Sequence, residues 1–253
     1  MQRCTLLAEI IARESVQAAP WVCYMQQLVP FSQSVCVAGS VGTWLAEYDV
    51  HGERPSWDPS DIDVFVMVPS RLAYVALCDA FVDSFASPPV DHAPVRISVN
   101  RPHHHILIVQ WWLTSNDIEF RCPDFSFIHS PTILSVDLLL DQFDIDICKV
   151  SVRLCADHLC FCLSSVVRSH IFERVMHCVM RQDPSSAAFY YPMQKTLDRV
   201  CKYAVRGYKF QSLQFWPSHS YLNVAAFEHV WLPQHLQASF LLEQPPVSEP
   251  MRM

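Results

Sequence analysis

The chain has 253 residues, of which 51% are hydrophobic and 17% are charged, and its formal net charge is −7. This composition supports a sizeable core, excludes global disorder, and argues against a basic surface that coats DNA. No stretch approaches the roughly 18 apolar residues of a membrane span, and no secretory leader follows Met1. We therefore expect an intracellular protein, cytoplasmic or nuclear, that has no membrane partner.

The hydrophobic pattern predicts an alternation of helices and strands in the first half of the chain. The expected helices cover residues 4–15, 41–48, 71–85 and 132–140, and a further apolar segment covers residues 22–29. The expected strands cover residues 35–38, 62–68, 95–99, 105–113, 118–121, 125–129 and 143–152. Prolines and Gly52 mark residues 49–60 as a loop.

After residue 155 the pattern becomes helical, with helices expected over residues 166–180 and 193–205 and Gly207 at a helix end. The fold class is therefore α/β (α+β), with a mixed sheet flanked by helices and a helical C-terminal lobe. We expect a first lobe over residues 1–155, a mostly helical lobe over residues 156–242 and a disordered tail over residues 243–253.

The eleven cysteines are scattered, odd in number, and mostly inside apolar runs. A set of this kind is a poor candidate for a disulfide scaffold. Cys155, His158, Cys160 and Cys162 lie close together in the sequence, but they lack the paired C-x-x-C spacing of zinc sites. We interpret them as buried free thiols that act as small hydrophobic side chains.

Glycines and acids gather in one part of the sequence. The chain has only four glycines, and two of them, Gly39 and Gly42, stand in one Gly-Ser-Val-Gly window. Glycine is needed where the backbone turns with positive φ or approaches another group closely. Asp61 and Asp63 follow, two residues apart in a run of β-formers, so they share one face of the expected strand. Two such carboxylates repel each other unless a cation lies between them.

A second acidic strand is expected at Phe-Asp-Ile-Asp-Ile-Cys, residues 143–148, where Asp144 and Asp146 share a face. Gly-Ser before a helix, then Asp-Ile-Asp on a strand, then a later acidic strand is an arrangement that resembles the nucleotidyltransferase superfamily, which has the polymerase-β-like fold. The resemblance covers about residues 35–152. Residues 143–149 and 202–208 also look like segments of poorly characterised viral and eukaryotic members of this superfamily.

The resemblance implies metal-dependent transfer of a nucleotidyl group from a nucleoside triphosphate to a hydroxyl acceptor, such as one on RNA or protein. It implies that Asp61, Asp63 and a third acid hold two Mg²⁺ or Mn²⁺ ions. We expect Asp144 to be that acid, because it follows a bulky apolar residue, and we keep Asp146 as the second candidate. Gly39 and Ser40, at a helix N-terminus, are expected to bind the triphosphate.

Lys195, Arg199, Lys202 and Arg206 share one face of the helix expected over residues 193–205. This face is a candidate contact for a triphosphate or an RNA backbone, and an ordinary solvated face is the alternative. An alternative also stands beside the enzyme hypothesis as a whole. The chain could be a catalytically silent member of the superfamily that binds nucleotides or proteins.

Overall fold

The computed structural model describes residues 20–86, 96–115, 118–130, 133, 135–155, 158–180 and 190–215. The chain divides into two compact units. The first comprises Met1–Phe143 with Ile147–Phe172, and the second comprises Asp144–Asp146 with Glu173–Met253. Helices and strands mix throughout, so the predicted α+β class is confirmed. The helix expected over residues 4–15 and the tail expected over residues 243–253 lie outside the described residues.

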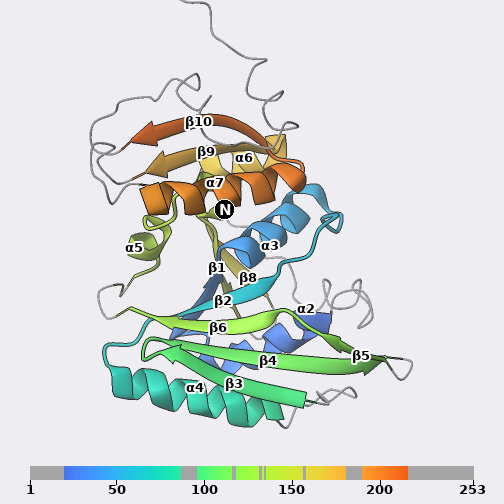
Figure 1. Cartoon of the computed structure of the whole chain (residues 1–253), viewed down its shortest axis with the longest axis vertical. Coiled ribbons are helices and arrows are strands. Elements are labelled where there is room, and N and C mark those ends of the chain that lie inside the picture. Colours follow the sequence, from blue (N-terminus) through green and yellow to red (C-terminus); the bar gives the residue numbers. More distant parts are fainter. Residues whose placement is uncertain are drawn as a thin grey trace, which may run out of the picture. The chain divides into compact units, whose positions relative to one another are not determined.

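The first unit is built on one eight-stranded sheet (Figure 1). Its strands are β1 (Val35–Ala38), β2 (Asp61–Val66), β3 (Arg96–His103), β4 (Ile106–Ser115), β5 (Ile118–Arg121), β6 (Asp124–His129), β7 (Ser151–Leu154) and β8 (Leu159–Cys162). Their order is β3-β4-β6-β2-β1-β7-β8, and β5 pairs with β4. In the described residues β2 and β6 run parallel, and the other neighbours in this sheet are antiparallel.

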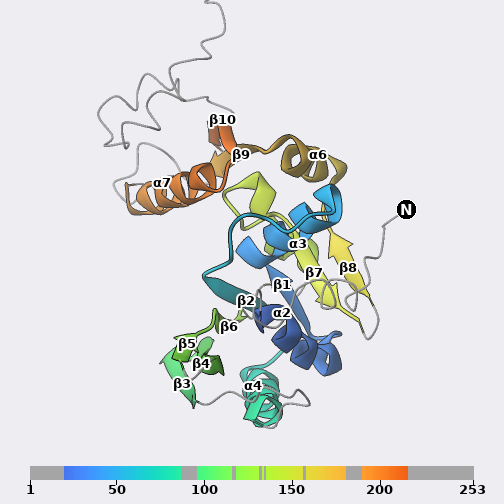
Figure 2. The same cartoon turned by 90° about the vertical axis from the view of Figure 1, so that its right-hand side faces the viewer.

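Helices precede β1, lie between later strands, and follow β8 (Figure 2). They are α2 (Pro20–Met25), the 3-10 helix η1 (Gln26–Phe31), α3 (Ser40–His51), α4 (Arg71–Ala86), α5 (Val136–Leu140), the 3-10 helix η2 (Asp146–Cys148) and α6 (Ser165–Glu173). None of the helices in the part of the chain that the structure describes has the length and apolar character needed to cross a membrane.

The main core covers one face of the sheet. On β6 the side chains alternate, so that Phe125 and Phe127 are buried while Asp124 and Ser126 on the other face are only half-buried. Helix α4 packs on the buried face, where the ring of Phe81 lies 4.6 Å from that of Phe127. This alternation leaves Asp124, the acidic residue of β6, on the less covered face.

Helix α3 is fixed at its first turn by a very close backbone approach. A Cβ added to Gly42 would lie 2.5 Å from the carbonyl oxygen of Val150. One residue later, the hydroxyl of Thr43 donates to the carbonyl oxygen of Ile147 at 2.9 Å. The second glycine of the Gly-Ser-Val-Gly window is therefore required for packing, because no larger residue fits between α3 and residues 147–150.

We expect Gly42→Ala to lower the free energy of unfolding by about 1–3 kcal/mol, the usual cost of overpacking. In an open helix the same change gains up to about 1 kcal/mol, but a 2.5 Å contact with a backbone carbonyl outweighs that gain. Urea denaturation measures the difference. Gly52→Asn is the matched control, because Gly52 has a left-handed backbone with nothing within 4 Å of an added Cβ, and asparagine tolerates that conformation. Equal stability of Gly42→Ala and the wild type would contradict the packing role.

The first half of the chain follows the sequence prediction closely. The strand expected over residues 35–38 is β1, the strand expected over residues 62–68 is β2, and the helix expected over residues 71–85 is α4. The β-type runs between residues 95 and 129 are β3 to β6. The helix expected over residues 132–140 begins only at Val136, because Ser135 caps it and accepts a hydrogen bond from the Leu138 N–H.

Two predicted elements are wrong. Residues 143–152 do not form one strand: Ile145 makes an isolated bridge with Cys178, η2 follows, and β7 starts at Ser151. The helix expected over residues 166–180 stops at Glu173, where Arg174 takes a left-handed φ of 55°. The β-branched residues after it then form a strand.

The described part of the second unit combines strands with a helix. It contains β9 (Val175–Met180), α7 (Tyr190–Val205) and β10 (Lys209–Phe215), and β9 and β10 pair in parallel. Figure 1 shows α7 lying along this two-stranded sheet. Gly207, just after α7, has a φ of 91° and ends the helix as the sequence predicts.

Candidate functional site

The predicted site residues of the first unit lie at one end of its central strands, where β1 ends and β2 and β6 begin. Strand β1 ends where its antiparallel neighbour β2 begins, so that Ala38 pairs with Asp63. Strand β6 begins at the same end, because it runs parallel to β2 with Asp61 paired to Asp124. Gly39 and Ser40 follow Ala38 directly. The sheet topology therefore brings together the Gly-Ser turn and the Asp-Ile-Asp strand.

Asp61 and Asp63 share the less covered face of β2, as the sequence predicts. Their side chains and that of Phe65 are half-buried, whereas the intervening residues of β2 are buried. Beyond the two acids this face is apolar, since Phe65 packs against Cys36 and Ala38. The two carboxylates thus lie at the start of β2, next to the apolar patch that contains Phe65.

Asp124 is a third carboxylate in this group, and the sequence analysis did not identify it. It occupies the first position of β6, in register with Asp61, and residues in register on adjacent strands are about 4.8 Å apart. The alternation of buried and half-buried side chains is the same in both strands. Asp124 and Asp61 therefore project from the same face.

Asp124 has an ionic partner on its own face. Arg121 binds it with two nitrogens, Nη2 to Oδ2 at 2.5 Å and Nε to Oδ1 at 3.1 Å. Gln110 Nε2 also donates to Oδ2 at 3.3 Å. The hydrogen bonds to Asp124, together with its charge, raise the pKa of Arg121, which keeps the guanidinium charged. About half of the Arg121 side chain is exposed, so water screens this ion pair.

Gly39 brings the backbone against the carboxylate of Asp63. Its φ of 68° and ψ of −135° are accessible to glycine but strained for other residues. A Cβ at this position would lie 3.2 Å from Asp63 Oδ2. The role that the sequence predicted for Gly39, a turn with close approach, is therefore present, and the group approached is the side chain of Asp63.

Ser40 starts α3 and has a polar atom without a partner. Its side chain is 8% exposed, and its Oγ has no hydrogen-bond partner among the residues that the structure describes. Gly39 offers no side-chain cap, and Thr43 is the residue whose N–H makes the first bond within the helix, to Gly39 O at 3.0 Å. The N–H groups before Thr43 precede the first bond of the helix and have no partner within it, which is the feature that lets helix N-termini bind anions.

The loop before Asp61 is held by α3. Trp57 Nε1 donates to Glu47 Oε2 at 3.1 Å, and Trp44 Nε1 donates to the carbonyl oxygen of Trp57 at 2.8 Å. At the end of the loop the hydroxyl of Ser60 donates to Asp61 Oδ1 at 2.8 Å. The spacer between Ser40 and Asp61 is thus anchored to α3, and these contacts set the place where β2 begins.

Asp144 and Asp146 have partners within the second unit. Asp144 accepts a short hydrogen bond from the Thr196 hydroxyl, and its Oδ2 pairs with Arg199 Nη1 at 2.5 Å. Asp146 Oδ1 accepts from the backbone N–H of His177 at 2.8 Å. The role of Asp144 as the third acid, with Asp146 as the second candidate, stays a prediction.

The basic face predicted on α7 is smaller than expected. Lys195, Arg199 and Lys202 are exposed, whereas Arg206 is 8% exposed and its guanidinium lies 5.0 Å from the centre of the Tyr203 ring. Arg206 therefore packs in the second unit. The exposed basic face of α7 consists of the other three residues.

A scan against protein-family models and a search of curated proteins found no match to this chain.

Proposed function

We propose that this protein is a metal-dependent nucleotidyltransferase that transfers a nucleotidyl group from a nucleoside triphosphate to a hydroxyl acceptor. One observation carries the proposal. Asp61, Asp63 and Asp124 share one face of the sheet beside the N-terminus of α3, which opens with Gly39 and Ser40. Carboxylates suit divalent cations, and a helix N-terminus suits phosphate.

The donor set fits Mg²⁺ or Mn²⁺. All three side chains offer hard carboxylate oxygens, the ligands that these ions prefer. Asp61, Asp63 and Asp124 would hold the ions, with Asp144 as the other proposed source of a third carboxylate. When bound, two such ions neutralise the charge that develops on the transferred phosphoryl group. The net charge of −7 gives a polyanionic substrate no general attraction to the chain.

The remaining roles fall to the polar groups of the chain itself. Ser40, with its buried Oγ and the N–H groups at the start of α3, would bind the triphosphate oxygens. A carboxylate of the site would accept the proton of the attacking hydroxyl. The basic face of α7, made of Lys195, Arg199 and Lys202, would contact the triphosphate or an RNA acceptor. The described cysteines form no disulfide, which suits an intracellular setting, cytoplasmic or nuclear.

The bidentate contact between Arg121 and Asp124 favours a second candidate function. A guanidinium that already neutralises Asp124 can substitute for a cation at this position. In that case the protein is a catalytically silent member of the superfamily that binds a nucleotide or a protein. The two functions differ in one measurable property, since the silent protein binds without releasing pyrophosphate.

The decisive experiment incubates the reduced chain with each labelled nucleoside triphosphate and Mg²⁺ or Mn²⁺, with RNA and protein acceptors. We expect pyrophosphate release and a labelled product with at least one nucleotide, and no product when the metal is chelated. A rise in melting temperature without pyrophosphate would support the silent function. Neither product nor a thermal shift with any of the four nucleotides would overturn the transferase and the nucleotide-binding form of the silent function, and would leave the protein-binding form.

Ser40→Ala is the variant that probes the phosphate contact in the same assay. Because Ser40 Oγ has no protein partner in the described part of the chain, its removal should leave the unfolding free energy unchanged and raise the KM for the nucleotide. Gly39→Val is a poorer probe, because a φ of 68° strains valine by about 1–3 kcal/mol. An unchanged KM in Ser40→Ala would remove Ser40 from the proposed site.

A further inference from the structure

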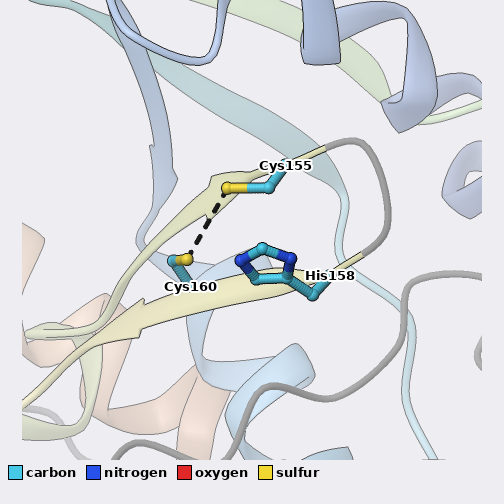
Figure 3. Close-up of side chains that lie close together, drawn as sticks. All are labelled: Cys155, His158 and Cys160. Carbon is cyan, nitrogen blue, oxygen red and sulfur yellow. Dashed lines mark hydrogen bonds between the residues drawn. The ribbon is translucent and has the colours of Figure 1, made fainter.

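The turn between β7 and β8 brings together three side chains that can bind a soft metal ion. The two strands are antiparallel with Leu154 paired to Leu159, and the Cys155 N–H donates to the His158 carbonyl oxygen at 2.9 Å. This pairing holds Cys155 and Cys160 on the same side of the hairpin with the imidazole of His158 beside them (Figure 3). All three side chains are half-buried, so an ion has access to them.

The spacing of the ligand atoms corresponds to a tetrahedral site. One ligand atom from each of Cys155, His158 and Cys160 lies within 4.8 Å of the other two. The two sulfurs are 3.6 Å apart. Two thiolates that are each about 2.3 Å from one zinc ion at the tetrahedral angle are about 3.8 Å apart. The sulfurs of a disulfide are only about 2.05 Å apart, so the observed spacing is much closer to that of two ligands of one ion.

We propose that Cys155, His158 and Cys160 bind one Zn²⁺ ion, with solvent in the fourth coordination position. Two sulfur ligands and one imidazole select zinc over Mg²⁺ or Ca²⁺, which require oxygen ligands. Each thiol loses its proton to solvent when its sulfur binds the ion. The site is on β7 and β8, at the opposite edge of the sheet from β3. The proposal does not rest on the transferase activity.

Cys162 is an internal control for this group. It lies on β8 two residues after Cys160, on the same face of the strand, and it is half-buried like the three proposed ligands. Among the described residues, only Cys155, His158 and Cys160 make up the group at this hairpin whose ligand atoms lie within 4.8 Å of one another.

Zinc at this position would stabilise the hairpin of β7 and β8, which forms one edge of the sheet. Strands β7 and β8 have four residues each, and β8 is the last strand in the order of the sheet. Such a short terminal hairpin is held by few backbone hydrogen bonds. An ion that binds only the folded hairpin raises its stability by mass action. Removal of the ion should therefore lower the melting temperature of the first unit.

The test uses the full chain, freshly reduced and stripped of metal. Titration with Co²⁺, a spectroscopic substitute for zinc, should give the intense visible bands of a tetrahedral site and the thiolate charge-transfer band, at one ion per chain. Zn²⁺ should abolish both. Cys155→Ser and Cys160→Ser should lose the charge-transfer band and bind at least 100-fold more weakly. His158→Gln should weaken binding, and Cys162→Ser should match the wild type.

Several results would overturn the proposal. One is the absence of Co²⁺ bands in the reduced wild type. Another is binding that survives in the double variant Cys155→Ser/Cys160→Ser, since the ion would then have other ligands. A third is loss of the bands in Cys162→Ser with the far-ultraviolet circular dichroism unchanged. If a cysteine variant fails to fold by that spectrum, His158→Gln decides: wild-type affinity in this variant counts against the site.

Discussion

Asp63→Asn is expected to reduce nucleotidyl transfer by about 10³-fold or more, equivalent to about 4 kcal/mol of lost transition-state stabilisation. Asparagine keeps the shape of the side chain but removes the charge that two divalent cations need. The loss should appear in kcat, because the ions act most strongly on the charge that develops during transfer. Initial rates at saturating nucleotide, over a range of Mg²⁺ concentrations, measure the effect.

The melting temperature of metal-free Asp63→Asn should stay close to that of the wild type. Asp61 and Asp63 lie two residues apart on one strand face, so removal of one charge reduces their mutual repulsion and offsets contacts that are lost. Asp83→Asn is the matched control, because it removes an equal charge from an exposed position of α4. If Asp63→Asn transfers at the wild-type rate with the same metal dependence, the proposed catalytic site is wrong.

The elements that carry the site were predictable because their signals are local. The alternation of Asp61 and Asp63 with apolar residues specifies a strand with both acids on one face, whatever the strand pairs with. The rarity of glycine marked Gly39 and Gly42, and both positions need glycine. Their reasons differ: Gly39 has positive φ beside Asp63, and Gly42 lies against Val150. Sequence alone gave no means to separate these reasons.

Asp124 could not be found from sequence, because its place depends on long-range pairing. It stands 63 residues after Asp61, and only the parallel pairing of β2 with β6 makes them neighbours. The segment Arg-Cys-Pro-Asp-Phe around it contains one isolated acid. Residues 143–148, by contrast, alternate like a strand, but their bridge to Cys178 and the hydrogen bond from Thr43 to Ile147 replace a regular ladder. Tertiary contacts overrode the local pattern there.

The zinc proposal illustrates the same limit of sequence patterns. Cys155, His158 and Cys160 do not have the paired spacing of common zinc motifs, so the sequence alone favours buried thiols at positions 155 and 160. Cys36, Cys78, Cys122, Cys148 and Cys178 are indeed buried, and none of them forms a disulfide in the described part of the chain. At the hairpin, however, the turn itself supplies the proximity that a C-x-x-C spacing supplies elsewhere. Antiparallel pairing brought residues 155 and 160 together.

Two acids compete for the role of third carboxylate, and their surroundings differ. Asp124 shares a sheet face with Asp61, and its partner Arg121 is about half exposed. An exposed ion pair of this kind is worth about 0–1 kcal/mol, so a divalent cation can displace Arg121 easily. Asp144 is bound by Thr196 and Arg199 within the second unit, in an ion pair whose exposure is close to that of the pair between Arg121 and Asp124. Either carboxylate must therefore give up or share an arginine to become a metal ligand, and what favours Asp124 is its register with Asp61 on the same sheet.

We therefore expect Asp124→Asn to reduce transfer by about 10²-fold or more, and Asp144→Asn to reduce it less, since one ligand lost from a metal site costs several kcal/mol. Arg121→Gln should separate the two roles of Asp124: it should leave transfer intact and lower the Mg²⁺ concentration needed for half-maximal rate, because it frees the carboxylate. Steady-state rates against Mg²⁺ for the three variants decide the matter. A larger loss in Asp144→Asn, with Asp124→Asn near the wild type, would return the role to Asp144. Equal, small losses in both would show that neither acid is the third carboxylate beside Asp61 and Asp63.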